Sequence, residues 1–393
     1  MIYFVVFILL LIPVVKYDWM AKVGGEKGWY CFNLLVLVLL AGLRYRVGSD
    51  TLMYMSMFDD CPKLDELRYF DFSTAKYNPL WYILNAISRS LYDNFTLFQI
   101  IHAVIINSVF FWFFRKYCPL YYFSAILLYY IGYFCYFNME VMRESLCISV
   151  LMLSTPFLLK RKWIAYYLMC FVGLLFHYSA IVMFGFPFLL FFKKPSWKLQ
   201  ILIFVSVLLV MRVINLPVLL LDLLGFNEQL TLLLKNYLEN QRNIMGIIAE
   251  LIKYTPVFIF ICFHERIRLV YKYDFTSIIM GVIIFYALSM SIGAFSRFIN
   301  YFVPFTIIYA INSIYALFSI KFKDMQVTGI SVLCGFTLLC VNLLSFYFND
   351  VSETYPNTRS YVRYVPYHSV LKPQIDEHRE RFVENDREVA IEF

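Results

Sequence analysis

The stretch FTLFQIIHAVIINSVFFWFF, residues 95–114, contains no Asp, Glu, Lys or Arg. A helix of about 20 mostly apolar residues is long enough to cross the hydrocarbon core of a bilayer. The stretch ends at the basic pair Arg115-Lys116, and such pairs favour the cytoplasmic side of a membrane. These residues therefore predict a membrane-spanning helix.

The composition of the whole chain agrees with this prediction. Of its 393 residues, 61% are hydrophobic and 16% are charged, whereas about 25% of the residues in a soluble domain are charged. This excludes a water-soluble enzyme, and the recurring apolar runs exclude a disordered chain. We expect an all-α polytopic membrane protein with about twelve transmembrane helices. The predicted spans are residues 1–15 (a retained anchor), 28–43, 95–114, 121–138, 145–159, 162–177, 178–192, 198–211, 248–264, 275–293, 300–318 and 327–348.

The short connections between these spans are basic, which predicts the topology. They are Lys16–Lys27, Arg115–Lys116, Lys160–Lys162, Lys193–Lys198, Arg266–Lys272 and Lys321–Lys323. The positive-inside rule places them in the cytoplasm and both termini outside. This parity requires the segment 79–91, which carries Asn85 and Arg89, to be an interfacial or re-entrant helix and not another crossing. We therefore expect one transmembrane domain, residues 1–348, with outer loops 44–78 and 212–247, and an extracytoplasmic tail, residues 349–393.

Ionisable side chains gather at the predicted outer ends of the helices. Inserting one of them into a membrane costs roughly 2.5–3.5 kcal/mol, so each needs a reason. Arg46 could simply reach lipid headgroups, Arg143 could neutralise a neighbouring carboxylate, and His177 could be a packing residue. Arg297 has no acid nearby in the sequence, which favours a functional role. The full set is Arg44, Arg46, Asp50, Glu140, Arg143, Glu144, His177 and Arg297.

This set of side chains suits one kind of substrate. Guanidinium groups bind phosphate oxygens through two parallel hydrogen bonds, and histidine or glutamate can act as a general base. A lipid-linked diphosphate that enters from the bilayer would use both. We find no glycine-rich nucleotide motif, no Asp-x-Asp motif and no zinc spacing. These absences argue against nucleotide-driven chemistry and against a cytoplasmic donor, and we expect no cofactor and no nucleic-acid partner.

Short motifs along most of the chain resemble a known family. They include GLRY at 42–45, VGSDT at 47–51 with Tyr54 beyond, NPL at 78–80, Arg143 at the head of a span, FHYSAI at 176–181, Arg297 with Tyr301-Phe302, and Pro366-Tyr367. In these motifs the chain resembles the EpsG family of bacterial polysaccharide polymerases, which are related to Wzy-type polymerases. The family commonly has Asn and Gln where this chain has Glu140 and Glu144, with Asn138 nearby instead. Whether Glu140 supplies a base or a salt bridge is therefore open.

The resemblance implies a GT-C-like glycosyltransferase bundle in the bacterial cytoplasmic membrane. Such an enzyme joins the repeat units of an O-antigen, capsule or exopolysaccharide on the outer face. It transfers the growing glycan from undecaprenyl diphosphate to the next lipid-linked repeat unit, without a metal. Membrane lipids, a chain-length regulator and the flippase of the same pathway are the expected partners.

The resemblance and the predicted depth together suggest residue roles. We expect Arg44, Arg143 and Arg297 to hold the diphosphate, and His177 or Glu140 to act as the base. Further expected substrate contacts are Arg46, Asp50, Tyr54, Glu144, Tyr301 and Tyr367. Two alternatives are an O-antigen-ligase-like transferase and a non-enzymatic flippase or transporter. Transporters tend to show internal repeats and helices broken at mid-membrane, and this chain shows no repeat.

Overall fold

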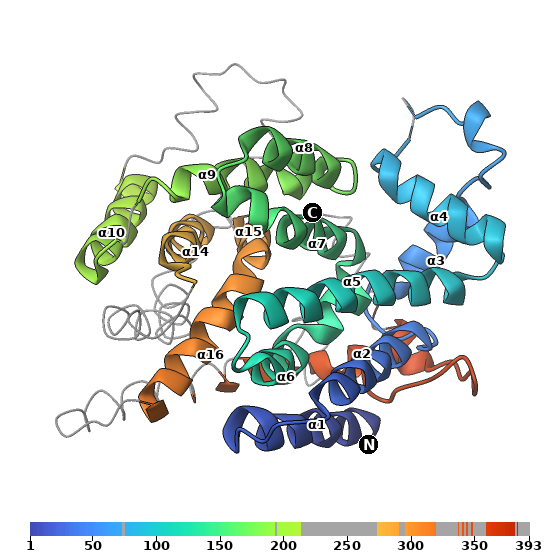
Figure 1. Ribbon diagram of the computed structural model, residues 1–393. Coiled ribbons are helices and arrows are strands. Elements are labelled where there is room, and N and C mark those ends of the chain that lie inside the picture. The colour runs from blue at the N-terminus through green and yellow to red at the C-terminus, as the bar shows by residue number, and fades with distance from the viewer. Residues whose placement is uncertain are drawn as a thin grey trace. The chain divides into compact units, whose positions relative to one another are not determined.

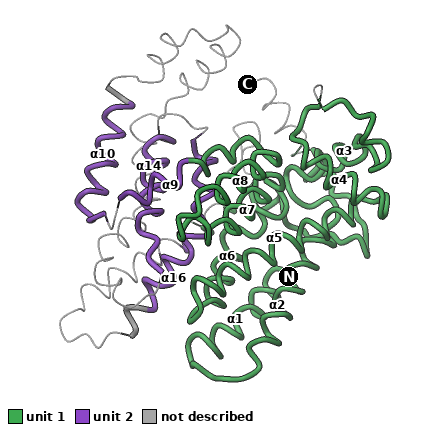
Figure 2. The backbone as a smooth tube through the Cα atoms, turned by 45° about the horizontal axis from the view of Figure 1, so that its top comes forward, with its two compact units in different colours: residues 1–184, 343–393 green, residues 185–342 purple. Residues whose placement is uncertain are grey.

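The computed structural model describes residues 1–72, 75–192, 195–213, 273–290 and 295–319, and near the C-terminus 337, 340, 341, 343, 344, 347, 348, 359–381 and 383. Every regular element within these ranges is helical (Figure 1). The chain divides into two compact units, Met1–Phe184 with Leu343–Phe393, and Gly185–Asn342 (Figure 2). Each unit is described by itself.

The first unit is built around one long apolar helix. This is α5 (Phe95–Tyr117), which packs against several other helical elements of the unit. Its start is capped by Asn94, whose side chain accepts a hydrogen bond from the backbone N–H of Thr96 at 2.8 Å. The elements of this unit are α1 (Ile2–Pro13), η1 (Val14–Trp19), α2 (Glu26–Gly42), α3 (Thr51–Asp59), η2 (Leu67–Tyr69), α4 (Pro79–Leu91), α5, α6 (Tyr122–Gly132), η3 (Tyr136–Glu140), α7 (Met142–Leu159), α8 (Trp163–Leu174), most of η4 (Tyr178–Gly185) and η8 (Ser360–Arg363).

The close packing of α2 on α5 explains the glycine of the GLRY motif. A Cβ at Gly42 would lie 2.8 Å from Cγ1 and 3.1 Å from Cα of Ile100 on α5. The second of these contacts is to backbone, which a rotamer change cannot relieve. Gly42 therefore brings the end of α2, and the loop that follows it, directly against α5.

The predicted helix at 79–91 is confirmed as α4, with the same first and last residues. Asn78 is extended and Pro79 occupies the first helical turn, where its missing N–H is not needed. Its buried side chains fall on one face, since Trp81, Asn85 and Ser88 recur at helical spacing. The interfacial position of this amphipathic helix stays a prediction.

Two predicted spans are interrupted. Within 121–138, α6 ends at Gly132 and a short π-helical turn, η3, follows. The Asn138 amide in that turn donates to the Phe134 carbonyl and the Tyr129 hydroxyl, both at 2.9 Å. Within 178–192, a 3₁₀ segment, η4, leads into the short α9 (Phe186–Leu189), with Pro187 in its first turn. One continuous α-helix is therefore wrong for each of these stretches.

The second unit holds the remaining described helices. They are α9, α10 (Trp197–Val213), α14 (Thr276–Ser289), α15 (Ser296–Ile299), η7 (Asn300–Phe302) and α16 (Val303–Ser319). The α14 helix packs against α9, α10 and α16. The Phe186 and Phe302 rings stack with centroids 4.7 Å apart, which joins α9 to η7.

Four helical stretches in the described ranges are long and apolar enough to cross a membrane. They are Ile2–Trp19, Phe95–Tyr117, Met142–Leu159 and Ser296–Tyr315, and they coincide with four predicted spans. Five shorter apolar helices overlap the predicted spans 121–138, 162–177, 178–192, 198–211 and 275–293, and α2 overlaps 28–43. The total of twelve spans, the topology and the GT-C-like arrangement stay predictions. The span 248–264, the loop 212–247 apart from the end of α10, most of the span 327–348, the tail residues 349–358 and 384–393, and the basic residues Lys193, Lys194, Arg266–Lys272, Lys321 and Lys323 lie outside the described residues.

Candidate active site

The side chain of Arg44 holds the loop after α2 together through hydrogen bonds to its backbone. This side chain is fully buried, and its guanidinium donates to the carbonyls of Ala41 at 2.5 Å and Val47 at 3.2 Å. A third nitrogen lies 3.4 Å from the Met142 sulfur, at the start of α7. Burial lowers the pKa of Arg44 to about 10, so it stays charged at neutral pH. Arg44 therefore fixes the loop, and its contact with a diphosphate stays a prediction that would require these bonds to be exchanged.

Gly48 brings the same loop against η3. Its φ of +109° lies in the region that favours glycine. A Cβ at this position would lie 2.8 Å from the Met139 carbonyl oxygen. The Thr51 hydroxyl closes the loop by donating to the Val47 carbonyl at 2.6 Å. The glycine in the VGSDT motif is thus required by the backbone.

The C-terminal segment, residues 359–381, packs against this loop. The backbone N–H of Tyr45 donates to the His368 carbonyl at 2.8 Å, and that of Val370 donates to the Leu43 carbonyl at 2.9 Å. The Tyr367 hydroxyl donates to the Leu40 carbonyl at 3.0 Å. Figure 1 shows this orange-to-red segment beside α2. The predicted substrate contact Tyr367 therefore anchors the segment to the end of α2.

Two charged contacts hold the same segment in place. The buried Arg379 guanidinium donates to the carbonyls of Val362, at 3.0 Å, Arg46, at 3.3 Å, and Pro366. Arg46, for its part, forms a two-pronged ion pair with Glu380. Arg46 is thus paired with Glu380 within the protein, and its contact with substrate stays a prediction.

Glu140 contacts two residues of the C-terminal segment. Its carboxylate accepts a hydrogen bond from the Tyr364 hydroxyl at 2.6 Å and lies 3.6 Å from the Arg363 guanidinium. The residue is buried, and burial raises the pKa of Glu140, an effect that Arg363 opposes. The salt bridge that the sequence suggested is present, with Arg363 as its partner, and the role of Glu140 as a base stays a prediction.

Arg143 stands in the first turn of α7 with aromatic neighbours. Its guanidinium carbon lies 4.6 Å from the centroid of the Tyr77 ring, in a cation–π contact. The Arg143 charge also acts on Tyr54. Burial and the Asp50 carboxylate raise the pKa of the Tyr54 hydroxyl, and the positive charge of Arg143 opposes that shift. The Arg143 Nε is buried and has no hydrogen-bond partner within the part of the chain that the structure describes. This N–H group can therefore donate a hydrogen bond to an anion that binds here.

His177 lies at the same end of the α7–α8 hairpin. Its Nδ1 accepts the backbone N–H of Ser179 at 3.1 Å and lies 2.7 Å from the Ser179 hydroxyl. Neutral His177 therefore carries its proton on Nε2. The thiol of Cys147 lies 3.5 Å from the Arg143 carbonyl and 3.9 Å from that of His177, so the two turns are neighbours.

The NPL motif joins this cluster through backbone contacts. The Asn78 amide donates to the Leu174 carbonyl at 2.8 Å, and the Leu80 N–H donates to the Leu175 carbonyl at 2.9 Å. These carbonyls end α8 immediately before the FHYSAI motif. The preceding residue, Tyr77, covers Arg143. Three motifs that are far apart in the sequence therefore meet around Arg143 and His177.

A comparison with protein families shows what these motifs belong to. The EpsG family matches residues 27–369, most of the chain. The chain belongs to the EpsG family. No curated protein and no solved structure matches it. Family membership and the apolar helices together indicate a multi-pass membrane protein.

The remaining predicted residues of this EpsG-family chain have different environments. Glu144 is buried in the first turn of α7, where the positive end of the helix dipole stabilises a carboxylate. Arg297 is exposed on α15 and Tyr301 is fully buried in η7, both in the second unit. Their participation in the site of the first unit stays a prediction. No group of three His, Cys, Asp or Glu residues in the described ranges could hold a metal ion.

Sequence reasoning missed several residues of the EpsG-family site. Tyr77 could have been found, because it directly precedes the NPL motif. The partners in the C-terminal segment, Arg363, Tyr364, Arg379 and Glu380, carry no signal in the sequence that separates them from a solvated charged tail. Their role follows only from the fold.

Proposed function

We propose that this protein is a polysaccharide polymerase. It transfers a growing glycan from undecaprenyl diphosphate to the next lipid-linked repeat unit, on the outer face of the bacterial cytoplasmic membrane. Membership of the EpsG family supports a polymerase-type function. The observation that carries the proposal is the meeting of the NPL, Arg143 and FHYSAI motifs at one end of α7.

In this proposal Arg143 binds the diphosphate of the donor. Its planar guanidinium matches phosphate oxygens, and its buried Nε has no hydrogen-bond partner among the described residues. The first turn of α7 adds backbone N–H groups and the positive end of a helix dipole. Charge that develops on the leaving diphosphate is thereby stabilised as the bond to the anomeric carbon breaks.

The proposed role of His177 is to donate a hydrogen bond. Because Ser179 occupies Nδ1, the proton on Nε2 is suited to a phosphate or sugar oxygen. Glu140 accepts a hydrogen bond from Tyr364 and lies beside Arg363, so we do not assign the acceptor proton to it. The acceptor hydroxyl then forms the new bond to the anomeric carbon, and its proton passes to the departing diphosphate.

The test is the glycan profile of a strain that lacks this protein, complemented with wild type, Arg143→Ala or His177→Ala at equal membrane levels. Polymerase function predicts that the ladder collapses to single lipid-linked repeats in the deletion and in both variants. Repeats trapped on the cytoplasmic face would instead indicate a flippase. Lipid-linked polymer that forms but is not passed on would indicate a ligase-like transferase.

A further inference from the structure

A surface cavity opens between α3 and the segment that leads into α4. Its volume is about 370 Å³, within the range of roughly 300–1,000 Å³ that small-ligand sites occupy. One wall is aromatic, formed by Phe70, Tyr77 and Tyr82. The Tyr82 ring lies 4.9 Å from that of Phe70 and 6.1 Å from that of Tyr77, measured between centroids, so this wall is continuous.

Three further lining residues are polar, and we call them the rim of the cavity. They are Ser56, Asp60 and Lys76, and the formal charges of the last two cancel. A sugar ring has C–H faces that pack on aromatic side chains and hydroxyls around its edge that need hydrogen-bond partners. An aromatic wall with opposite charges on the rim suits such a ring. A phosphate would find one cation and one anion here, and Arg143 is the better partner for it.

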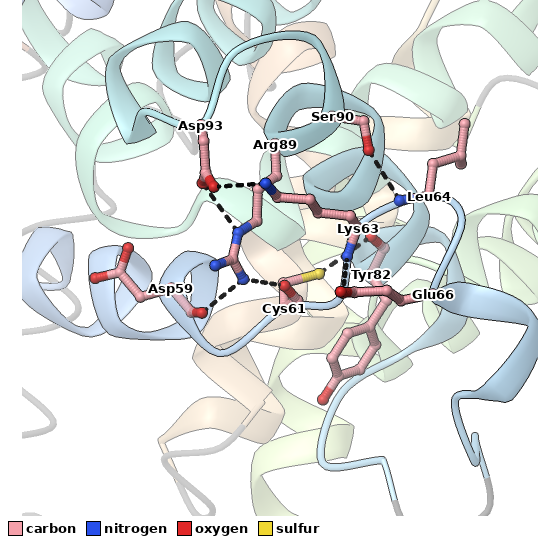
Figure 3. Close-up of polar contacts among 9 residues, drawn as sticks. All are labelled: Asp59, Cys61, Lys63, Leu64, Glu66, Tyr82, Arg89, Ser90 and Asp93. Carbon is pink, nitrogen blue, oxygen red and sulfur yellow. Dashed lines mark hydrogen bonds and ion pairs between the residues drawn. The ribbon is translucent and has the colours of Figure 1, made fainter.

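The residues on either side of Asp60 are held by Arg89 of α4 (Figure 3). The Arg89 guanidinium donates to the carbonyl of Asp59 at 2.7 Å and to that of Cys61, the residues on either side of Asp60. Asp93 fixes the guanidinium from the other side, with Nε and Oδ1 3.0 Å apart. This clamp determines where the backbone of Asp60 stands at the rim.

The loop is attached to α4 at two more points. The Cys61 thiol donates to the Tyr82 carbonyl at 3.5 Å, and the Leu64 N–H donates to the Ser90 hydroxyl at 2.8 Å (Figure 3). The first of these contacts ties the loop to the residue that forms part of the aromatic wall. The polar rim and the aromatic wall are therefore held in one arrangement.

We infer that this cavity binds a sugar ring of the lipid-linked glycan, with Asp60 as its carboxylate ligand and Arg89 as the positioning residue. The identity of the glycan rests on the proposed function. Tyr77 connects the two sites, because its ring both lines the cavity and contacts Arg143. A sugar in the cavity thus lies next to the position proposed for the diphosphate.

The test is direct binding to the full-length protein in detergent. The probe is the free glycan released by mild acid from the lipid-linked repeat unit and labelled at its reducing end. Asp60→Asn and Tyr82→Ala should each raise Kd about tenfold, the effect of losing one charge-assisted hydrogen bond or one aromatic contact. Asp59→Asn is the matched control, because only its backbone contacts Arg89 and its carboxylate points away in Figure 3. Wild-type affinity in both Asp60→Asn and Tyr82→Ala would overturn the inference.

Arg89 is tested by a double-mutant cycle. Arg89→Gln should weaken glycan binding in the wild-type background and add little in the Asp60→Asn background, because it acts through Asp60. Equal losses in both backgrounds would show that Arg89 only supports the fold, and would overturn its role. Thermal unfolding of each variant accompanies the binding measurement.

Two further arms identify the bound group. A glycan trimmed at its non-reducing end keeps its affinity if the cavity holds the sugar next to the diphosphate, and loses it if the cavity holds the acceptor end. Competition by sugar-free undecaprenyl phosphate would mark a phosphate site and overturn the inference. These binding results do not depend on the polymer ladder, so failure of the cavity and failure of the polymerase proposal are distinguishable.

Discussion

The hydroxyl of Tyr364 donates to the carboxylate of Glu140 at 2.6 Å, although the two residues lie 224 positions apart in the chain. This contact joins the C-terminal segment to the turn directly before α7. Because Arg143 stands in the next turn, the segment supports the part of the protein where the proposed chemistry takes place. The C-terminal segment is therefore a structural part of the site.

Tyr364→Phe should lower the thermal stability of the protein. It removes a buried hydrogen bond to a carboxylate, which contributes roughly 1.5–3 kcal/mol. The measurement is Tm of the purified protein in detergent. Tyr361→Phe is the control, since Tyr361 lies in the same segment and is 40% exposed. Equal Tm values for Tyr364→Phe and Tyr361→Phe would contradict a stabilising contact.

The raised pKa of Glu140 predicts a pH dependence. A carboxyl group whose pKa is higher in the folded state than its usual value of about 4.3 contributes most stability below that value. Its contribution is lost as pH rises through the folded pKa. Glu140→Gln should therefore flatten the fall in Tm between about pH 4.3 and neutral pH. A variant profile parallel to that of wild type would assign the slope to another group.

Arg379→Met should release the C-terminal segment. Its guanidinium satisfies the carbonyls of Val362, Arg46 and Pro366, and the substitution leaves these acceptors without their donor. Faster cleavage of the segment in limited proteolysis is the expected result. Arg381→Met, at a side chain that is 77% exposed, should be cleaved like wild type. A protected segment in Arg379→Met would show that the other contacts suffice.

Gly48→Ala should destabilise the loop after α2. The added Cβ would meet the Met139 carbonyl at 2.8 Å, and the backbone has φ +109°. The expected outcome is a lower Tm and less protein in the membrane. Gly28→Ala is the control, because no atom of the described residues lies within 4 Å of its added Cβ and alanine is favoured in a helix by roughly 0.5–1 kcal/mol. Wild-type Tm and membrane levels in Gly48→Ala would show that the loop adapts.

The sequence predicts local features of this fold well. Helix α4 has the predicted first and last residues because Pro79 marks its start and apolar residues follow at helical spacing. The gathering of Arg143 and the FHYSAI motif follows from the alternation of spans. The partners of Arg46 and Glu140 do not, since they lie 334 and 224 positions away in a segment that reads as solvated. The break after Gly132 was also missed, because the apolar run continues through it while the backbone turns.

Arg143→Lys should separate charge from geometry at the proposed diphosphate site. Lysine keeps the positive charge, but it lacks the planar fork that binds two phosphate oxygens and has no group in place of Nε. Loss of one such contact to a developing charge lowers a rate by about 10²–10³, so the polymer ladder should shorten strongly at equal membrane levels. Arg161→Lys, at an exposed position at the opposite end of α7, should leave the ladder intact. A full ladder in Arg143→Lys with none in Arg143→Ala would mean that charge alone suffices. In that case the positive charge at this position would bind the diphosphate without the planar fork, and the buried Nε would serve only the packing of Tyr77.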